Sequence, residues 1–258
     1  MKRFSTCLYL VCGVLVATAS RAAVAADWSS TNAQFLNGDD FIIPGIVGDI
    51  EKNILTLEHA SGWKYGDNFF FVDVTNGDGT ASELYGEFNP RFSFGKLNEW
   101  KPDGFVRDLL LAAQWNFGKD DAGNVSAYLV GIGFDLAVPK AAFFQLNLYQ
   151  RSEHNDQVFG RTNDDTWQLN VAGLFPFNLG GSSWSVGGFA DYVGKVNGPF
   201  GENEAHLLIV PQLLLDVGAM AGSPGVIQAG IEYSYWKNKF GVDGETERVV
   251  QLMVKWTM

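Results

Sequence analysis

Arg248-Val249-Val250-Gln251-Leu252-Met253-Val254-Lys255-Trp256-Thr257-Met258 is the stretch that decides the fold. From Val250 onward every second residue is large and apolar, and the residues between them are mostly polar. Successive side chains of a β-strand point to opposite faces, so this segment predicts a strand with one apolar and one polar face. Ending on such a strand is expected of an outer-membrane barrel, whose last strand closes the sheet.

The same alternation recurs along the chain. Segments 143–151, 166–171 and 226–235 each place apolar residues on one face and amide or charged residues on the other. Segment 205–213 is weaker, because Leu208 and Val210 occupy its polar face. Clusters of Gly, Asp and Asn separate the segments and predict turns between strands.

Eleven candidate strands follow, each near the ~9–11 residues that a tilted membrane strand needs. They begin near Asn53, Asn68, Glu83, Phe105, Val125, Ala141, Asp164, Ser183, Glu204, Gly225 and Thr246. Single-chain bacterial barrels have even strand numbers, and Trp28 to about Gly38 supplies a first strand. We therefore expect residues 27–258 to form an all-β domain, a transmembrane antiparallel β-barrel of about twelve strands.

This strand order also predicts the sides of the barrel. With both termini in the periplasm, the connections near 77–82, 118–124, 154–163, 195–203 and 238–245 face outside, and the 138–140 turn faces inside. The soluble alternative is a secreted sandwich or lipocalin-like barrel. It is disfavoured by the many amides on the polar face and by tryptophans near strand ends, where a membrane girdle would place them: Trp63, Trp100, Trp184 and Trp256.

Residues 1–26 have the pattern of a secretory signal peptide. Lys2 and Arg3 precede an apolar run, and small residues permit cleavage after Ala25 or Ala26. A retained anchor is the alternative, but the run is shorter than the ~20 residues of a membrane span. We expect export to the outer membrane of a Gram-negative bacterium, with outer-membrane lipid around a monomeric barrel.

Cysteine usage and charge exclude several classes of function. Both cysteines, Cys7 and Cys12, lie in the predicted signal peptide, so the rest of the chain offers no disulfide, zinc cluster or cysteine nucleophile. The chain has 18 basic and 29 acidic residues, a net charge of −11. Such an acidic protein is a poor candidate for binding nucleic acid.

Three segments resemble the nucleoside-specific channel family of Gram-negative outer membranes, of the Tsx and OmpK type. They are Ile54-Leu55-Thr56-Leu57-Glu58-His59, Trp63-Lys64-Tyr65-Gly66-Asp67-Asn68-Phe69-Phe70-Phe71-Val72-Asp73-Val74 and Leu84-Tyr85-Gly86-Glu87-Phe88-Asn89-Pro90-Arg91-Phe92-Ser93. The resemblance implies a narrow barrel that conducts nucleosides passively and can serve as a phage receptor. Two departures bear on ligand identity: Asn89 stands where the family pattern has a second glutamate, and Met258 replaces a terminal aromatic residue.

If the apolar residues face lipid, the opposite phase of each strand faces the lumen. On the strands that carry the resemblance, this predicts the ligand-binding residues Glu58, Phe69, Phe71, Asp73, Tyr85, Glu87, Asn89 and Arg91. On the others it predicts Gln114, Asn116, Gln145, Asn147, Tyr149, Arg151, Gln168, Asn170, Asp191, Gln212, Glu232, Gln251 and Lys255.

These residue types suit a nucleoside. Its flat base stacks on aromatic faces, worth ~1–3 kcal/mol per base, and its hydroxyl groups and base edges need carboxylates and amides. The alternative is that the same groups only wet a narrow lumen. Arg91 would then form a structural ion-pair cluster with Glu58, Asp73 and Glu87.

Two other functions stay open: a general small-solute pore, and a surface or phage receptor barrel of the same fold without nucleoside selectivity. We expect no enzyme and no cofactor. The histidines are His59, His154 and His206, there is no G-x-S-x-G motif, and Ser234 beside His206 is a weak pair. We expect no metal either, because the stretch from Asp73 to Gly79 lacks EF-hand spacing.

The segment Phe41-Ile42-Ile43-Pro44-Gly45-Ile46-Val47 predicts a long, apolar first outer loop. We expect it to fold over or into the barrel mouth and narrow the pore. The alternative is a loop that packs on the rim.

Overall fold

The computed structural model describes residues 26–43, 50–77, 82–100, 102–120, 123–154, 156–157, 163–198 and 201–258. Residues 1–25 of the predicted signal peptide, and residues 44–47 of the predicted apolar loop, lie outside this part of the chain.

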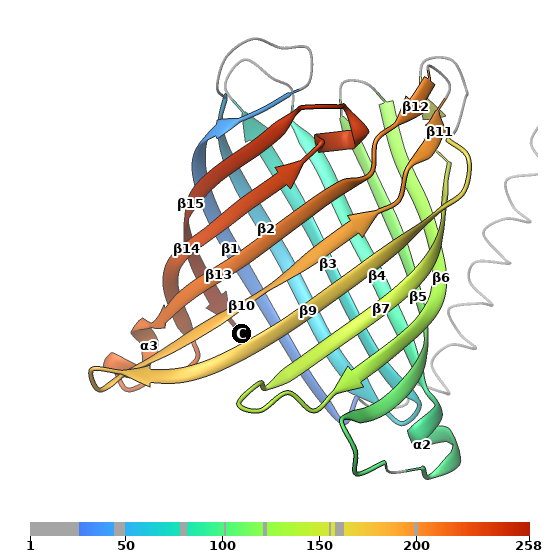
Figure 1. Cartoon of the computed structure of the whole chain (residues 1–258). Coiled ribbons are helices and arrows are strands. Elements are labelled where there is room, and N and C mark those ends of the chain that lie inside the picture. Colours follow the sequence, from blue (N-terminus) through green and yellow to red (C-terminus); the bar gives the residue numbers. More distant parts are fainter. Residues whose placement is uncertain are drawn as a thin grey trace, which may run out of the picture.

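Within the described residues, twelve long antiparallel strands form the fold. They are β1 (Trp28–Phe41), β2 (Ile50–Trp63), β3 (Gly66–Gly77), β4 (Glu83–Ser93), β5 (Val106–Asp120), β6 (Gly123–Leu136), β7 (Phe143–Glu153), β9 (Thr166–Leu179), β10 (Ser182–Val193), β13 (His206–Asp216), β14 (Ile227–Lys237) and β15 (Thr246–Thr257). Each long strand pairs with its neighbours along the chain, and β1 also pairs with β15. The sheet therefore closes on itself as a barrel (Figure 1).

This confirms the predicted fold. The predicted strand starts lie close to the observed ones, the largest difference being Asn53 against Ile50. The first strand runs past the predicted Gly38 to Phe41, across a register shift at which Asp40 has φ 69°.

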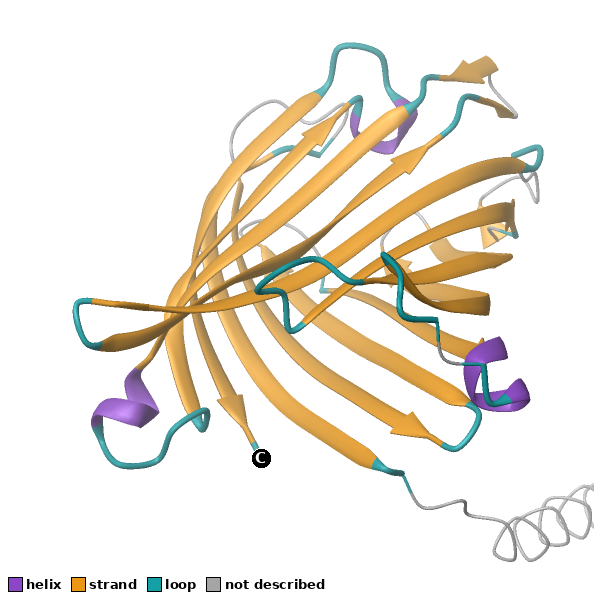
Figure 2. Ribbon diagram, turned by 60° about the horizontal axis from the view of Figure 1, so that its bottom comes forward, coloured by secondary structure: helices purple, strands orange, loops and turns teal. Residues whose placement is uncertain are grey.

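Several short elements were not predicted. They are strand β8 (Asp156–Gln157), the hairpin β11 (Val196–Gly198) and β12 (Gly201–Asn203), helices α2 (Phe94–Asn98) and α3 (Val217–Met220), and the 3₁₀ turn η1 (Lys239–Gly241). Helices α2 and α3 lie at the same end of the barrel as the start of β1 and the end of β15, which we call the terminal end (Figures 1 and 2). The opposite end, which holds the β11–β12 hairpin, is called the distal end.

Connection length does not distinguish the two ends. The terminal end has tight turns at 64–65 and 180–181, but it also holds the longer connections that contain α2 and α3. The predicted turn at 138–140 lies at the terminal end, as expected from the strand order, and the assignment of the distal end to the outside stays a prediction.

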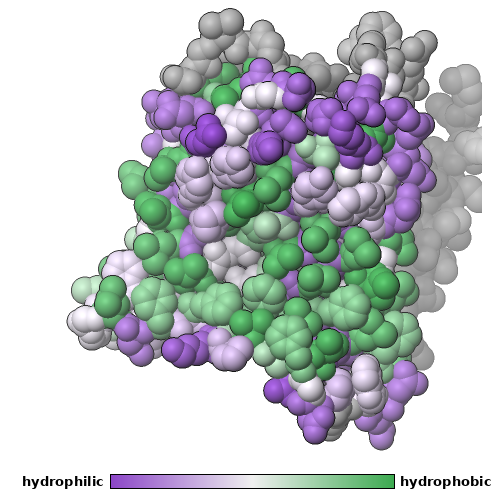
Figure 3. All heavy atoms as spheres, in the orientation of Figure 1, coloured by the Kyte–Doolittle hydropathy of each residue, from purple (hydrophilic) through white to green (hydrophobic). Residues whose placement is uncertain are grey.

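The outer surface of the wall is apolar. Leu252, Leu55 and Phe35 are each more than half exposed although the residues beside them on the strand are mostly buried. Figure 3 shows a band of hydrophobic residues across the lower part of the barrel and a hydrophilic distal end. A closed strand wall with an exposed apolar band is the surface of a transmembrane barrel, since lipid rather than water covers it. All four predicted girdle tryptophans, Trp63, Trp100, Trp184 and Trp256, lie toward the terminal end.

None of the described helices is long and apolar enough to cross a membrane.

Candidate functional site

The eight predicted ligand residues form one patch on the inner wall of β2, β3 and β4. The register pairs Glu58 with Phe71 and Phe71 with Glu87 on neighbouring strands. Asp73 pairs with Tyr85, and Phe69 pairs with Asn89, in the same way. Residues of the opposite phase on these strands, such as Leu55, Leu57 and Phe88, are exposed on the outside. The strand phase read from the sequence therefore placed the patch correctly on the inside.

Three aromatic rings follow one another along this patch. The ring centroids of Phe69 and Phe71 are 6.0 Å apart, and those of Phe71 and Tyr85 are also 6.0 Å apart. The planes are tilted by 48° and 52°, so the rings do not stack on each other, and all three are half-buried. The faces of such rings are able to take a flat apolar or aromatic group.

Acceptors flank the three rings. Glu87 accepts a hydrogen bond from the Tyr85 hydroxyl at 2.7 Å and a longer one from Asn89 Nδ2 at 3.4 Å. Asp73 accepts from Thr56 Oγ1 at 2.5 Å. Each carboxylate has more acceptor sites than these donors fill, because an ionised carboxylate offers about four lone-pair positions.

Glu58 belongs to a tighter network at the seam between the first and last strands. Its carboxylate accepts from Asn32 Nδ2 at 2.8 Å and from Gln34 Nε2 at 3.3 Å, and Lys255 Nζ lies 3.3 Å away. Because its partners surround it, Glu58 is the member of the acidic set that is least available to a ligand.

Arg91 has different partners from those predicted. Its guanidinium makes two 2.8 Å hydrogen bonds to Asp67 and lies 3.0 Å from Asp135, and the residue is only 3% exposed. It makes no ion pair with Glu58, Asp73 or Glu87 among the described side chains, so the predicted cluster is corrected to Arg91, Asp67 and Asp135. Asp67 has the same inward phase as Phe69 and Phe71, so its position in the lumen could have been predicted from the sequence. The contact with Asp135 could not have been predicted, because β5 separates its strand from that of Arg91.

Other polar side chains of the lumen are also linked by hydrogen bonds. On β5, Gln114 donates to Asn116 at 2.8 Å, and Asn116 donates to the Tyr85 hydroxyl at 2.9 Å. On β9 and β10, Asp191 accepts from Gln168 at 2.7 Å and from Asn170 at 3.0 Å. On β13, β14 and β15, Glu232 accepts from Gln212 at 2.7 Å and from Gln251 at 2.9 Å. The sequence placed all of these side chains in the lumen, and the structure agrees.

An apolar cluster lies inside the distal mouth, and it was not predicted from the sequence. Phe41, Ile50 and Val249 are buried together, and Ile43 and Ile54 pack against them. The register shift before Phe41 turns its ring inward, out of the phase that Gly38 and Leu36 follow. Phe41, the first residue of the predicted apolar loop, belongs to strand β1 and packs in this cluster with Ile43 beside it. The path of the loop and its effect on conductance stay predictions.

A buried ion pair lies beside this cluster. Lys239 of η1 pairs with Glu247 of β15, whose Oε2 also accepts from the backbone N–H of Ile42 at 2.9 Å. Burial lowers the pKa of the Lys239 ammonium, and the neighbouring Glu247 carboxylate acts in the opposite direction. The pair fastens the start of the first loop to the last strand.

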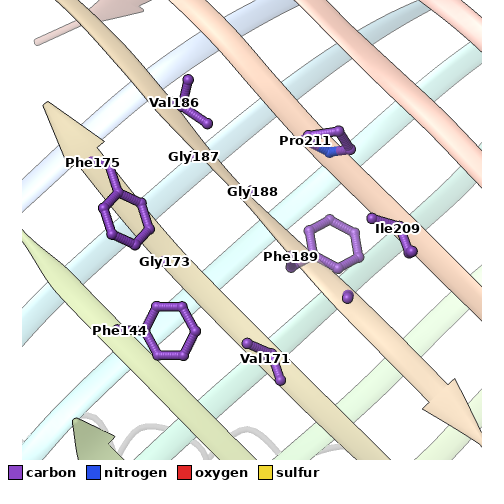
Figure 4. A pocket seen from close by; sticks show the side chains of 11 residues that line it. Phe144, Val171, Gly173, Phe175, Val186, Gly187, Gly188, Phe189, Ile209 and Pro211 are labelled. Carbon is purple, nitrogen blue, oxygen red and sulfur yellow. The ribbon is translucent and has the colours of Figure 1, made fainter. Parts of the chain in front are cut away.

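A shallow apolar depression also exists on the outer wall across β7, β9, β10 and β13 (Figure 4). Phe144, Phe175 and Pro211 line it, and Gly173 and Gly188 form part of its floor. These side chains have the lipid-facing phase, so the depression is a feature of the membrane surface and not of the lumen.

Each of the three histidines has a polar neighbour. His206 Nδ1 accepts from Trp236 Nε1 at 3.1 Å, and His59 on the outer face bonds to Thr31. His154 is exposed, and its Nε2 lies 3.3 Å from Ser152 Oγ. Among the described residues, no group of His, Cys, Asp or Glu side chains is arranged to hold a metal ion.

No protein family matches the sequence of this chain. No curated protein matches it either. Among solved structures, the chain is similar to the NanC porin, with 11% identity, a TM-score of 0.47, and coverage of 89% of this chain and 99% of that one. It is similar to the KdgM porin at 8% identity and a TM-score of 0.44, covering 87% and 98%. The translocator domain of the autotransporter NalP from Neisseria meningitidis gives 10% identity and a TM-score of 0.44, covering 98% and 96%. At these values the likenesses carry no conclusion about function, and the fold rests on the strand pairing of this chain.

Proposed function

We propose that this chain is an outer-membrane channel that passes nucleosides down their concentration gradient. The observation that carries the proposal is the inner-wall patch in which Phe69, Phe71 and Tyr85 lie beside the acceptors Asp73, Glu87 and Asn89. The rings offer faces to a base, and the acceptors suit the hydroxyl groups of a ribose. The resemblance of these same strands to the Tsx and OmpK type supports the choice of a nucleoside over another small solute.

The patch suits transport because its side chains belong to the wall of the barrel. Passage requires binding that is favourable enough for entry and weak enough for release. The rings are half-buried, and the carboxylates are held by neighbours on the same sheet. The side chains alone perform this function, and it needs no cofactor or covalent step.

Influx into proteoliposomes tests the proposal. We expect vesicles that contain the mature protein to take up labelled adenosine and thymidine faster than glucose, and each nucleoside to slow the uptake of the other. Equal uptake of all three solutes would contradict nucleoside selectivity and favour a general small-solute pore. No uptake of any of them would contradict a channel and favour a receptor barrel.

A further inference from the structure

We propose that the lumen conducts cations in preference to anions, and that it favours permeant solutes rich in hydrogen-bond donors, such as ammonium compounds. The inference rests on the proposed channel but not on the nucleoside as its solute. The observations behind it are the pairing of charges inside the barrel and the atoms that pairing leaves unfilled.

Four inward carboxylates are held by neutral donors alone. Asp73 has Thr56, Glu87 has Tyr85 and Asn89, Asp191 has Gln168 and Asn170, and Glu232 has Gln212 and Gln251. Within the described chain, no Lys, Arg or His nitrogen lies within 4.0 Å of any of the four. Hydrogen bonds from amides and hydroxyls keep these side chains in place, but they leave the negative charge uncompensated at close range.

The described Lys and Arg side chains that point into the lumen pair with carboxylates other than these four. Each forms an ion pair with a different carboxylate: Lys52 with Glu83, Arg91 with Asp67 and Asp135, Arg151 with Glu153, Lys239 with Glu247, and Lys255 with Glu58. Among the described residues, the positive charges of the lumen are therefore matched locally, and the surplus is negative.

The four carboxylates act on the interior from different sides. They come from β3, β4, β10 and β14, and in the barrel β10 is separated from β4 by four strands in one direction. Glu87 lies in the electrostatic field of Asp191, and Glu232 lies in the fields of Asp73 and Glu58. The Arg151 guanidinium acts on Glu87 and Asp191 in the opposite direction, but its ion pair is with Glu153. Carboxylates that face one another across a confined lumen reinforce their potentials, which attracts cations and repels anions.

Buried oxygen atoms without a hydrogen-bond donor are a second observation that favours donor-rich solutes. Asn89 Oδ1, Asn147 Oδ1 and Gln251 Oε1 are buried side-chain oxygens without a hydrogen-bond partner. Their amide orientation is fixed, because each NH₂ group donates to an oxygen: Glu87, Asn170 and Glu232, respectively. Asn147 and Gln251 are only 4% and 3% exposed. Buried acceptors of this kind are normally filled, so these oxygens are places where water or a permeant solute can donate a hydrogen bond.

The reversal potential of the mature protein in a planar bilayer tests this directly. With a KCl gradient at mildly alkaline pH, where carboxylates are ionised, we expect a K⁺ to Cl⁻ permeability ratio above one. Asp191→Asn and Glu232→Gln should each lower the ratio, because they remove charge from a held position without changing side-chain size. Glu51→Gln is the matched control, since Glu51 is exposed on the outer face and should leave the ratio unchanged.

The outcomes separate this inference from the proposed function. A ratio at or below one, or a ratio that Asp191→Asn and Glu232→Gln leave unchanged, would overturn cation preference even if nucleosides still pass. A ratio above one in a channel indifferent to nucleosides would support cation preference and contradict the proposed solute. A refolded barrel that passes no current would overturn both.

Discussion

Single hydrogen bonds between neighbouring strands organise the interior of this barrel, and Arg91 shows how much one residue can hold. Its guanidinium joins β4 to β3 through Asp67 and reaches β6 through Asp135. A buried arginine with two carboxylate partners is expensive to remove, because its partners are then left as uncompensated charges. Arg91 thus acts on the shape of the candidate patch rather than as a ligand group.

We expect Arg91→Ala to lower the free energy of unfolding by about 3–5 kcal/mol, the usual cost of breaking a buried ion pair. Denaturant unfolding of the refolded protein in lipid vesicles measures this. Arg107→Ala is the control, because Arg107 is exposed on the next strand. Equal stability of the two variants would mean that the Arg91 cluster does not support the barrel.

Phe71 is the centre of the aromatic row, and its neighbour Phe70 has the opposite phase and stacks with Phe117 on the outer side. We expect Phe71→Ala to raise the adenosine concentration at which influx is half-maximal. The rise should correspond to about 1–3 kcal/mol of binding free energy, the contribution of stacking one base. Phe70→Ala should leave this concentration unchanged. An equal effect of both changes would assign the loss to the sheet and not to stacking.

The face of the strand on which each side chain lies was predictable from the sequence. The side chains that it contacts on other strands were not. Alternation alone placed Phe69, Asp73 and Glu87 inside, because a strand allows two faces only. The contact of Arg91 with Asp135 depends on how far two side chains reach across an intervening strand. No pattern within one strand encodes that distance.

The strand β1 carries a local irregularity. The sequence predicts a strand that ends near Gly38, but the strand continues to Phe41 with a register shift and a positive φ at Asp40. An irregularity of this kind re-aims the side chain that follows. Here it aims Phe41 at Ile50 and Val249 inside the distal mouth.

We expect Phe41→Ala to raise the single-channel conductance, because it removes a ring from the apolar cluster inside the distal mouth. Phe35→Ala is the matched control on the same strand, since Phe35 is 51% exposed on the outer face. Unchanged conductance in Phe41→Ala would mean that the ring packs on the rim without limiting the path.

At the scale of the whole molecule, closure of the sheet and the apolar outer band determine where the chain can reside. Every backbone group of a spanning strand needs a partner, and the pairing of β1 with β15 removes the last open edge. Twelve strands were predictable because turns and alternation repeat along the chain. The helices in two terminal-end connections were not, because each is too short to leave a periodic signal.

We expect Leu252→Arg to cost about 2–4 kcal/mol of stability in lipid if this position lies near the bilayer midplane. Leu252 is 67% exposed on β15, and Val242, 41% exposed beyond η1 at the distal end, provides the control Val242→Arg. The comparison is made by denaturant unfolding in the same vesicles. A cost that is the same at both positions would contradict the placement of the apolar band in lipid.

Nucleoside transport by this barrel requires that a nucleoside contacts the inner wall as it passes. Single-channel current through the mature protein in a planar bilayer, titrated with adenosine and then with glucose, tests this contact most directly. We predict current steps that adenosine blocks saturably and glucose does not. Steps indifferent to adenosine at every concentration would contradict the proposed contact.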